Sequence, residues 1–306
     1  MTFQREHHRQ RRTGQESRAA AGTGFLFGFT TVACITGFVA TYYYFVRTTT
    51  GQFIDESALV ESMAVHGPAG KAATEFLDWL PTISLVVAAV VVLFVTVIRR
   101  RWAAAGIAVA ACVGANVATQ VLKDLLPARP YRGVETLELN SLPSGHTTLA
   151  ASAAAAVFLM ASPRWRPLAG FVGGTFAIAS GMSTLVNQWH RPADVVAAFL
   201  LVGVFMIPAG WLIIRTGGAW NVWEGFGRHW GSSRLWIALP VVLGLGSAVV
   251  AVISLARIAP GLEQQDSTTS YFWAGISLIV IAGYLATVAT TALFAYAARR
   301  RDAPRR

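Results

Sequence analysis

Long runs without a charged residue constrain this chain more than any other feature. A helix needs about 20 consecutive apolar residues to cross the hydrocarbon core of a bilayer. Inside lipid the backbone must satisfy its own hydrogen bonds, which leaves helices and closed barrels as spanning structures. We therefore expect an all-α fold, a polytopic membrane helix bundle. The eight candidate spans are 24–46, 83–98, 103–122, 147–161, 168–186, 195–214, 235–255 and 271–297.

Composition agrees with this interpretation. Of the 306 residues, 54% are hydrophobic and only 13% are charged, whereas a soluble globular chain carries about 25% charged residues. An ordinary soluble domain is therefore excluded. Runs 83–98 and 147–161 are short, so they must borrow flanking residues or lie at protein contacts. Run 147–161 is also rich in alanine, which favours close packing between helices.

The formal net charge of +10 is distributed in a pattern. Basic residues precede the first span and follow every second span, as is typical of the cytoplasmic side of a membrane protein. The pattern places both termini in the cytoplasm. It predicts that residues 47–81, between the first two spans, form an outward loop, which is acidic in part at Asp55 and Glu56. The pattern predicts that these basic residues contact the anionic membrane surface and that the protein does not bind nucleic acid. The residues are Arg5, Arg9, Arg11, Arg12, Arg18, Arg99, Arg100, Arg101, Arg164, Arg166, Arg215, Arg228, Arg234, Arg299, Arg300, Arg301, Arg305 and Arg306.

The spans predict a six-span core followed by two C-terminal transmembrane helices. Cys34 and Cys112 fall inside spans, where cysteines are usually small packing residues, so we expect neither a disulfide nor a metal site. Gly24 and Gly28 form a small-xxx-small pair that is compatible with a homo-oligomer. The expected units are a basic cytoplasmic segment 1–23, the core 24–215, a cytoplasmic connection 216–234, a two-span unit 235–298 and a basic tail 299–306.

Residues 143–146 read Pro-Ser-Gly-His at the start of a span. Ser144 is a good N-cap, and Gly145 lets a ligand approach the backbone closely. A helix that begins here presents free N–H groups and a positive dipole end, which bind phosphate readily. His146 lies in its first turn. A capped helix with an incidental histidine is the alternative.

His190 and Asp194 are four residues apart, so on a helix they share a face. Pro192 between them suits a first helical turn. A carboxylate that holds one imidazole nitrogen fixes the tautomer and leaves the other nitrogen to react. A structural pair at the membrane interface is one alternative. A metal site is another, but no third ligand lies nearby in the sequence.

Lys123 and Arg129 place two cations at the end of the third span. Lys123 could simply snorkel to the interface, but Arg129 lies beyond the span. Cations and a helix N-terminus together make an anion site. Since the predicted topology puts all three segments on the outward face, we expect them to form one site.

These motifs resemble the type-2 phosphatidic acid phosphatase (PAP2) superfamily, which also includes vanadium haloperoxidases and glucose-6-phosphatase. The family signature has a Lys followed by Arg-Pro, a Pro-Ser-Gly-His, and a Ser-Arg followed by a spaced His and Asp. Here Lys123 with Arg129-Pro130, residues 143–146, and Ser183 with His190 and Asp194 are similar to its three parts. The resemblance covers the six spans from about 24 to 215.

Two departures from the family pattern stand out. Five residues separate Lys123 from Arg129, where the family usually has six. Thr184 stands where the family has an arginine that grips phosphate, and a hydroxyl cannot replace a guanidinium fork. Arg191 and Arg132 are the nearest replacement cations in the sequence. We favour Arg191, because it adjoins His190.

The resemblance implies hydrolysis of a lipid phosphate without a metal or cofactor. His190 would attack phosphorus, Asp194 would orient it, and His146 would protonate the leaving group. Lys123, Arg129, Ser144, Gly145 and Arg191 would bind the phosphate. Phosphatidic acid, phosphatidylglycerol phosphate, a prenyl phosphate or diphosphate, and a glycolipid-precursor phosphate are the expected substrates. A lipid phosphotransferase, or a catalytically weak relative that binds or transports phospholipid, is the alternative.

Overall fold

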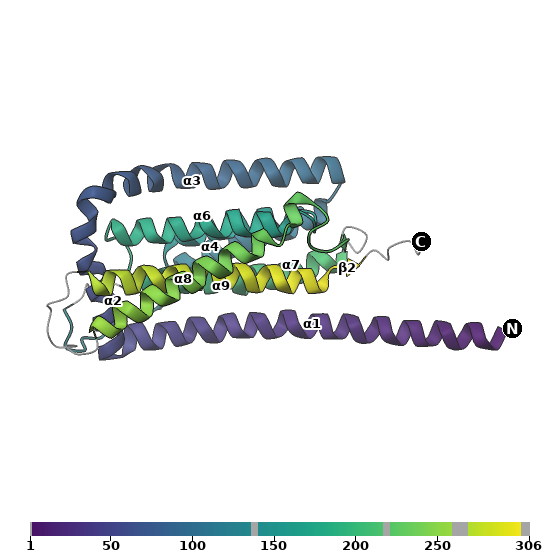
Figure 1. Ribbon diagram of the computed structural model, residues 1–306, viewed down its shortest axis with the longest axis horizontal. Coiled ribbons are helices and arrows are strands. Elements are labelled where there is room, and N and C mark those ends of the chain that lie inside the picture. The colour runs from purple at the N-terminus through teal and green to yellow at the C-terminus, as the bar shows by residue number, and fades with distance from the viewer. Residues whose placement is uncertain (1, 136–139, 217–220, 259–268, 301–306) are drawn as a thin grey trace.

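A computed structural model describes residues 2–135, 140–216, 221–258 and 269–300. Its helices form a bundle whose long members run along one axis (Figure 1). The helices are α1 (Thr2–Arg47), α2 (Thr49–Glu61), α3 (Met63–Arg99), α4 (Trp102–Leu125), α5 (Gly145–Met160), α6 (Arg166–Val186), α7 (Pro192–Thr216), the short 3₁₀ helix η1 (Trp230–Ser232), α8 (Leu235–Ile258) and α9 (Ser270–Ala297).

The all-α, polytopic membrane fold is confirmed. Among the described residues, seven helices are long and apolar enough to cross a membrane, in α1, α3, α4, α6, α7, α8 and α9. The expected span 147–161 is helix α5, whose 16 residues make it shorter than the others. The expected span 83–98 does borrow flanking residues, because the apolar part of α3 extends over Ala69–Arg99.

Residues 47–81, which the pattern predicts as an outward loop, are mostly helical. They form α2 and the first turns of α3. Thr48 caps α2, and its hydroxyl accepts a hydrogen bond from the Gly51 N–H at 3.1 Å. Scattered polar and acidic residues hide this helix from a search for apolar runs. Helix α2 lies at one end of the bundle, beside the start of α3 (Figure 1).

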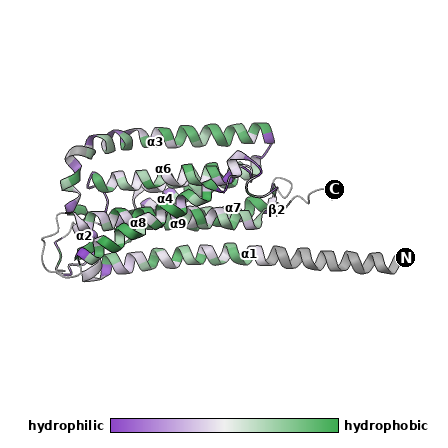
Figure 2. Ribbon diagram, viewed as in Figure 1, coloured by the Kyte–Doolittle hydropathy of each residue, from purple (hydrophilic) through white to green (hydrophobic). Residues whose placement is uncertain are grey.

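Helices α5 and α7 supply much of the core, whereas several other helices face outward. Ala150, Ala153 and Ala156 of α5 are buried, in agreement with the close packing that its alanines predict. Helices α1, α3 and α8 instead expose many large apolar side chains, and hydrophobic residues are frequent along the coloured part of α1, the later turns of α3 and α8 in Figure 2. In a bilayer these faces contact lipid, since there is no water to penalise them.

Helix α9 packs directly against the core. A Cβ at Gly174 of α6 would lie 2.2 Å from the Oγ1 of Thr287, and one at Gly170 would lie 2.8 Å from the Oγ1 of Thr291. These two glycines, four residues apart, let the α6 and α9 backbones approach closely, as small residues do between membrane helices. The ring of Phe294 on α9 also occupies the space beside Gly210 of α7.

The two ends of the bundle differ in composition. At the histidine end lie α2, residues 126–135 and residues 187–191; at the arginine end lie residues 99–101, 161–165 and 221–234. Helix α1 begins and α9 ends at the arginine end (Figure 1). There β1 (Val222–Trp223) pairs in parallel with β2 (Arg299–Arg300).

Candidate active site

His190 and Asp194 interact as their spacing predicts. His190 lies in the turn before α7, and Asp194 in the first turn of that helix. The Nδ1 of His190 lies 3.2 Å from the Oδ2 of Asp194. Backbone bonds also hold this turn, since the Thr184 carbonyl accepts from the N–H groups of Trp189 at 2.9 Å and His190 at 3.2 Å. A buried carboxylate on Nδ1 leaves Nε2 as the nitrogen that can react.

Asp194 is fully buried and organises several groups. Its Oδ2 also accepts from the Ser141 hydroxyl at 2.6 Å and from the Arg191 N–H at 3.1 Å. Its backbone carbonyl accepts from the N–H of Ser144 at 2.9 Å. That last bond joins the start of α7 to the start of α5, so two motifs whose bonded residues are 50 positions apart in the sequence meet here.

The start of α5 has the predicted cap. The Ser144 hydroxyl accepts from the Thr147 N–H at 3.4 Å, and the helix begins at Gly145. A Cβ at Gly145 would lie 3.7 Å from the ammonium nitrogen of Lys123 and 3.9 Å from the amide nitrogen of Gln120. Lys123, in the last turn of α4, therefore lies against the first turn of α5. A positive helix end and an ammonium group meet at this point.

His146 shares these surroundings. Its ring packs on that of Trp189, with 5.3 Å between the ring centroids. Desolvation lowers the pKa of His146 from its ordinary value, and the neighbouring charges of His190 and Lys123 lower it further. His146 therefore lies near both His190 and Lys123. His146 is only partly buried, whereas His190 is 9% exposed.

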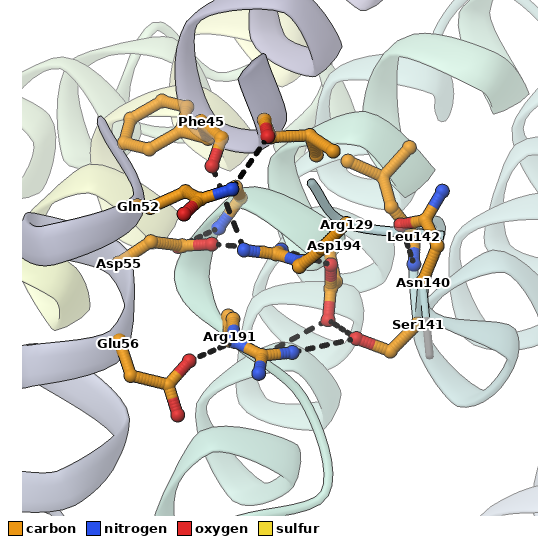
Figure 3. Close-up of polar contacts among 12 residues, drawn as sticks. Phe45, Gln52, Asp55, Glu56, Arg129, Asn140, Ser141, Leu142, Arg191 and Asp194 are labelled. Carbon is orange, nitrogen blue, oxygen red and sulfur yellow. Dashed lines mark hydrogen bonds and ion pairs between the residues drawn. The ribbon is translucent and has the colours of Figure 1, made fainter. Parts of the chain in front are cut away.

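Arg129 lies in a buried network with two carboxylates (Figure 3). Its Nη2 is 3.2 Å from the Oδ2 of Asp55 and 3.7 Å from the Oδ1 of Asp194. The other oxygen of Asp55 accepts from the Ala193 N–H at 3.0 Å. The Nε of Arg129 is buried without a hydrogen-bond partner among the described residues. The network thus ties α2 to the start of α7.

Arg191 is likewise buried and paired. Its Nε donates to the Oε2 of Glu56 at 2.6 Å, and its Nη1 donates to the Ser141 hydroxyl at 3.2 Å (Figure 3). Its Nη2 has no hydrogen-bond partner among the described residues. Thr184 offers no substitute for a guanidinium, since its buried hydroxyl donates to the Gly181 carbonyl at 2.8 Å within its own helix.

Several contributing residues escaped the sequence analysis. Asp55 and Glu56 stood out only as acidic members of an expected loop, although a consecutive Asp-Glu pair in an otherwise apolar segment is a signal for buried arginine partners. Ser141 and Trp189 carried no signal at all. Within the ranges that the structure describes, no group of three His, Cys, Asp or Glu side chains is arranged to hold a metal ion.

Comparisons with known proteins agree with this geometry. Residues 106–219 match the model of the PAP2 superfamily, a stretch that runs from within α4 to the end of α7 and includes the three motifs. In this segment the chain is similar to the PAP2 superfamily. Neither the curated proteins nor the solved structures include a match to the chain. The seven long apolar helices among the described residues indicate an integral membrane protein, and the family that the segment resembles is one of phosphatases.

Proposed function

We propose that this protein hydrolyses a lipid phosphate or diphosphate through a phosphohistidine on His190. The observation that carries the proposal is the buried His190–Asp194 pair, at 3.2 Å, beside the Lys123 ammonium, the α5 N-terminus and His146. Phosphoryl transfer through a covalent intermediate needs a nucleophile, a carboxylate that orients it, an acid such as the second histidine, and a cation.

In the first step the Nε2 of His190 attacks phosphorus. A bond forms between nitrogen and phosphorus while the bond from phosphorus to the leaving oxygen breaks. Protonated His146 gives its proton to that oxygen, which is general acid catalysis. Asp194 stabilises the charge that develops on the His190 ring. In the second step a water molecule, deprotonated by His146, attacks phosphorus and releases His190 and inorganic phosphate.

The phosphate oxygens require donors that remain available. Lys123 and the first N–H groups of α5, around Ser144 and Gly145, lie on one side of the histidines. On the other side Arg129 and Arg191 each keep a buried nitrogen without a partner among the described residues. We propose that these nitrogens bind phosphate, with Arg191 in place of the arginine absent at Thr184. The donors act mainly on the charge of the transition state.

The membrane setting narrows the substrate. The candidate site lies at the histidine end of apolar helices, where a lipid headgroup would present its phosphate. The arginine-rich opposite end suggests that the site is extracytoplasmic. The proposed substrate class comprises phosphatidic acid, phosphatidylglycerol phosphate, prenyl phosphates and diphosphates, and glycolipid-precursor phosphates.

The test is a phosphate-release assay over a panel of these lipids, using protein purified in detergent. We expect release from at least one member, inhibition by vanadate, and a loss of at least about a thousandfold in His190→Ala. His66→Ala is the matched control, because His66 lies exposed on α3 and its ring lies 3.0 Å from the Val186 carbonyl. Release that survives His190→Ala would overturn the mechanism.

Two alternatives have distinct outcomes in the same experiment. A phosphorylated acceptor lipid, formed in place of inorganic phosphate, would identify a phosphotransferase. Lipid binding without turnover or a phosphoenzyme would identify a catalytically weak relative. The neutral Thr184 hydroxyl, which is turned to its own helix, is the observation that favours the second.

A further inference from the structure

A cleft opens at the arginine end of the bundle, at the opposite end from His146 and His190. It lies between the turn that joins α5 to α6 and the segment from Val222 to Ser232, and its volume is about 560 Å³. Arg99, Arg164 and Arg228 line it, and all three are exposed. Glu224 is the acidic residue among those that line it. The cleft therefore presents an excess of positive charge.

An apolar groove continues from this cleft along the bundle. It runs between α3, α5 and α6, has a volume of about 540 Å³, and is lined by residues such as Phe94, Val157 and Val172. Arg99, Ser162 and Arg164 line both the cleft and the groove. The polar, cationic cleft thus joins the apolar groove at the level where a membrane helix ends.

The walls of the cleft also suit a membrane interface. His229 accepts a hydrogen bond from the Gly231 N–H on Nδ1, at 2.9 Å, so its neutral ring carries the proton on Nε2 and can donate it. The ring of Trp165 packs against both His229 and Trp230, with centroids 4.8 Å and 5.7 Å apart. Tryptophan is typical of the interfacial layer, where one side of the ring meets lipid and the other meets water.

We propose that the cleft and groove bind one anionic phospholipid, separate from the substrate site. The phosphodiester would lie among Arg99, Arg164 and Arg228, and an acyl chain would lie in the groove. A soluble anion would use the cleft but not the groove, and an uncharged lipid would use the groove but not the arginines. Basic pockets between membrane helices on the cytoplasmic side commonly hold anionic headgroups.

The test measures lipid retention by the full-length protein in detergent, by native mass spectrometry, during titration with phosphatidylglycerol or phosphatidylcholine. We expect several-fold stronger retention of phosphatidylglycerol. In Arg164→Gln/Arg228→Gln we expect phosphatidylglycerol affinity to fall on the order of tenfold. The matched control is Arg215→Gln/Arg234→Gln, because both of these arginines are exposed near the same end but do not line the cleft. It should retain phosphatidylglycerol normally.

A second variant tests the groove without altering charge. Val172→Trp fills the groove at a residue that is 56% exposed, and Val242→Trp adds the same bulk to α8 at a residue that is 63% exposed. We expect only Val172→Trp to weaken phosphatidylglycerol retention. Equal retention of the two lipids by the unaltered protein would overturn the proposal. So would equal losses in both arginine pairs, or no loss in Val172→Trp.

Discussion

The two halves of the candidate site are built differently. On one side Asp55, Glu56, Arg129 and Arg191 are tied by short, buried contacts between α2 and the start of α7. On the other side Lys123 lies beside Gly145 at the start of α5, and His146 is only partly buried. His190 and Asp194 lie between the two halves.

The contrast indicates that the two halves of the site have different roles. Buried charges are costly to desolvate, so they persist where partners fix them, and removing one partner leaves the other uncompensated. The network half can therefore hold the His190 turn in position. The open half keeps the Lys123 ammonium and the second histidine near the place where a phosphate would enter. The following variants separate these roles.

His146→Asn tests the open half and should have the largest effect. Loss of a general acid typically costs about 10²–10⁴-fold in rate, and asparagine keeps polarity without a titratable proton. We expect kcat for phosphate release to fall in this range. A substrate with a very acidic leaving group, such as a nitrophenyl phosphate, should recover part of the loss, because its oxygen needs no proton. Full activity with an alkyl phosphate would contradict the role of His146.

Asp55→Ala tests the network half. Arg129 would keep Asp194, at 3.7 Å, as its carboxylate partner, and the Ala193 N–H would lose its acceptor. Breaking a buried ion pair in this way costs about 3–5 kcal/mol. We expect a large fall in the free energy of unfolding in mixed micelles. Glu75→Ala is the control, since its pair with Lys71 is exposed and should contribute little. Equal stability of the two variants would show that the network does not hold the fold.

Arg191→Lys tests whether a network residue also binds phosphate. Lysine keeps the charge near Glu56 but loses the guanidinium fork and its free Nη2. We expect kcat/KM to fall about ten- to a hundredfold, the value of one hydrogen bond to a charged group. Glu56→Gln, which disturbs only the pair, should cost less. If even Arg191→Ala leaves turnover unchanged, Arg191 does not replace the arginine missing at Thr184.

Lys123→Met tests a specific effect on pH dependence, beside the fall in kcat/KM that we expect from the loss of a proposed phosphate-binding cation. Desolvation, His190 and Lys123 all lower the pKa of His146, so the acid form is lost as pH rises through a value below its ordinary 6.5. The alkaline limb of kcat/KM should lie below that pH. Removing the Lys123 charge raises the pKa, and the limb should move to higher pH. Lys71→Met, an exposed lysine on α3, should leave the limb in place. If the alkaline limb of kcat/KM does not move in Lys123→Met, the Lys123 charge does not affect the pKa of His146.

Much of this fold could be predicted because lipid makes the sequence pattern simple. Apolar runs identified the spanning helices, and the Pro-Ser-Gly-His and His-x-x-x-Asp motifs located the cap at Ser144 and the pair between His190 and Asp194. These features depend on local spacing, which a sequence displays directly.

The remaining features depend on contacts between distant segments. Helix α2 lacks an apolar run, so residues 47–81 were mistaken for a loop. Nothing local to Arg129 or Arg191 indicates that Asp55 and Glu56, more than 70 positions earlier, will pair with them. The close approach of α6 and α9 likewise becomes visible only when Gly170 and Gly174 are placed opposite Thr287 and Thr291.

The most direct test of the central claim is to trap the phosphoenzyme. Protein incubated with a lipid phosphate labelled with ³²P is quenched in alkali, which preserves phosphohistidine, and the label is located by proteolysis. We predict label on His190 in the unaltered protein and in His66→Ala, and none in His190→Ala. Label at another residue, or turnover by His190→Ala, would contradict the account.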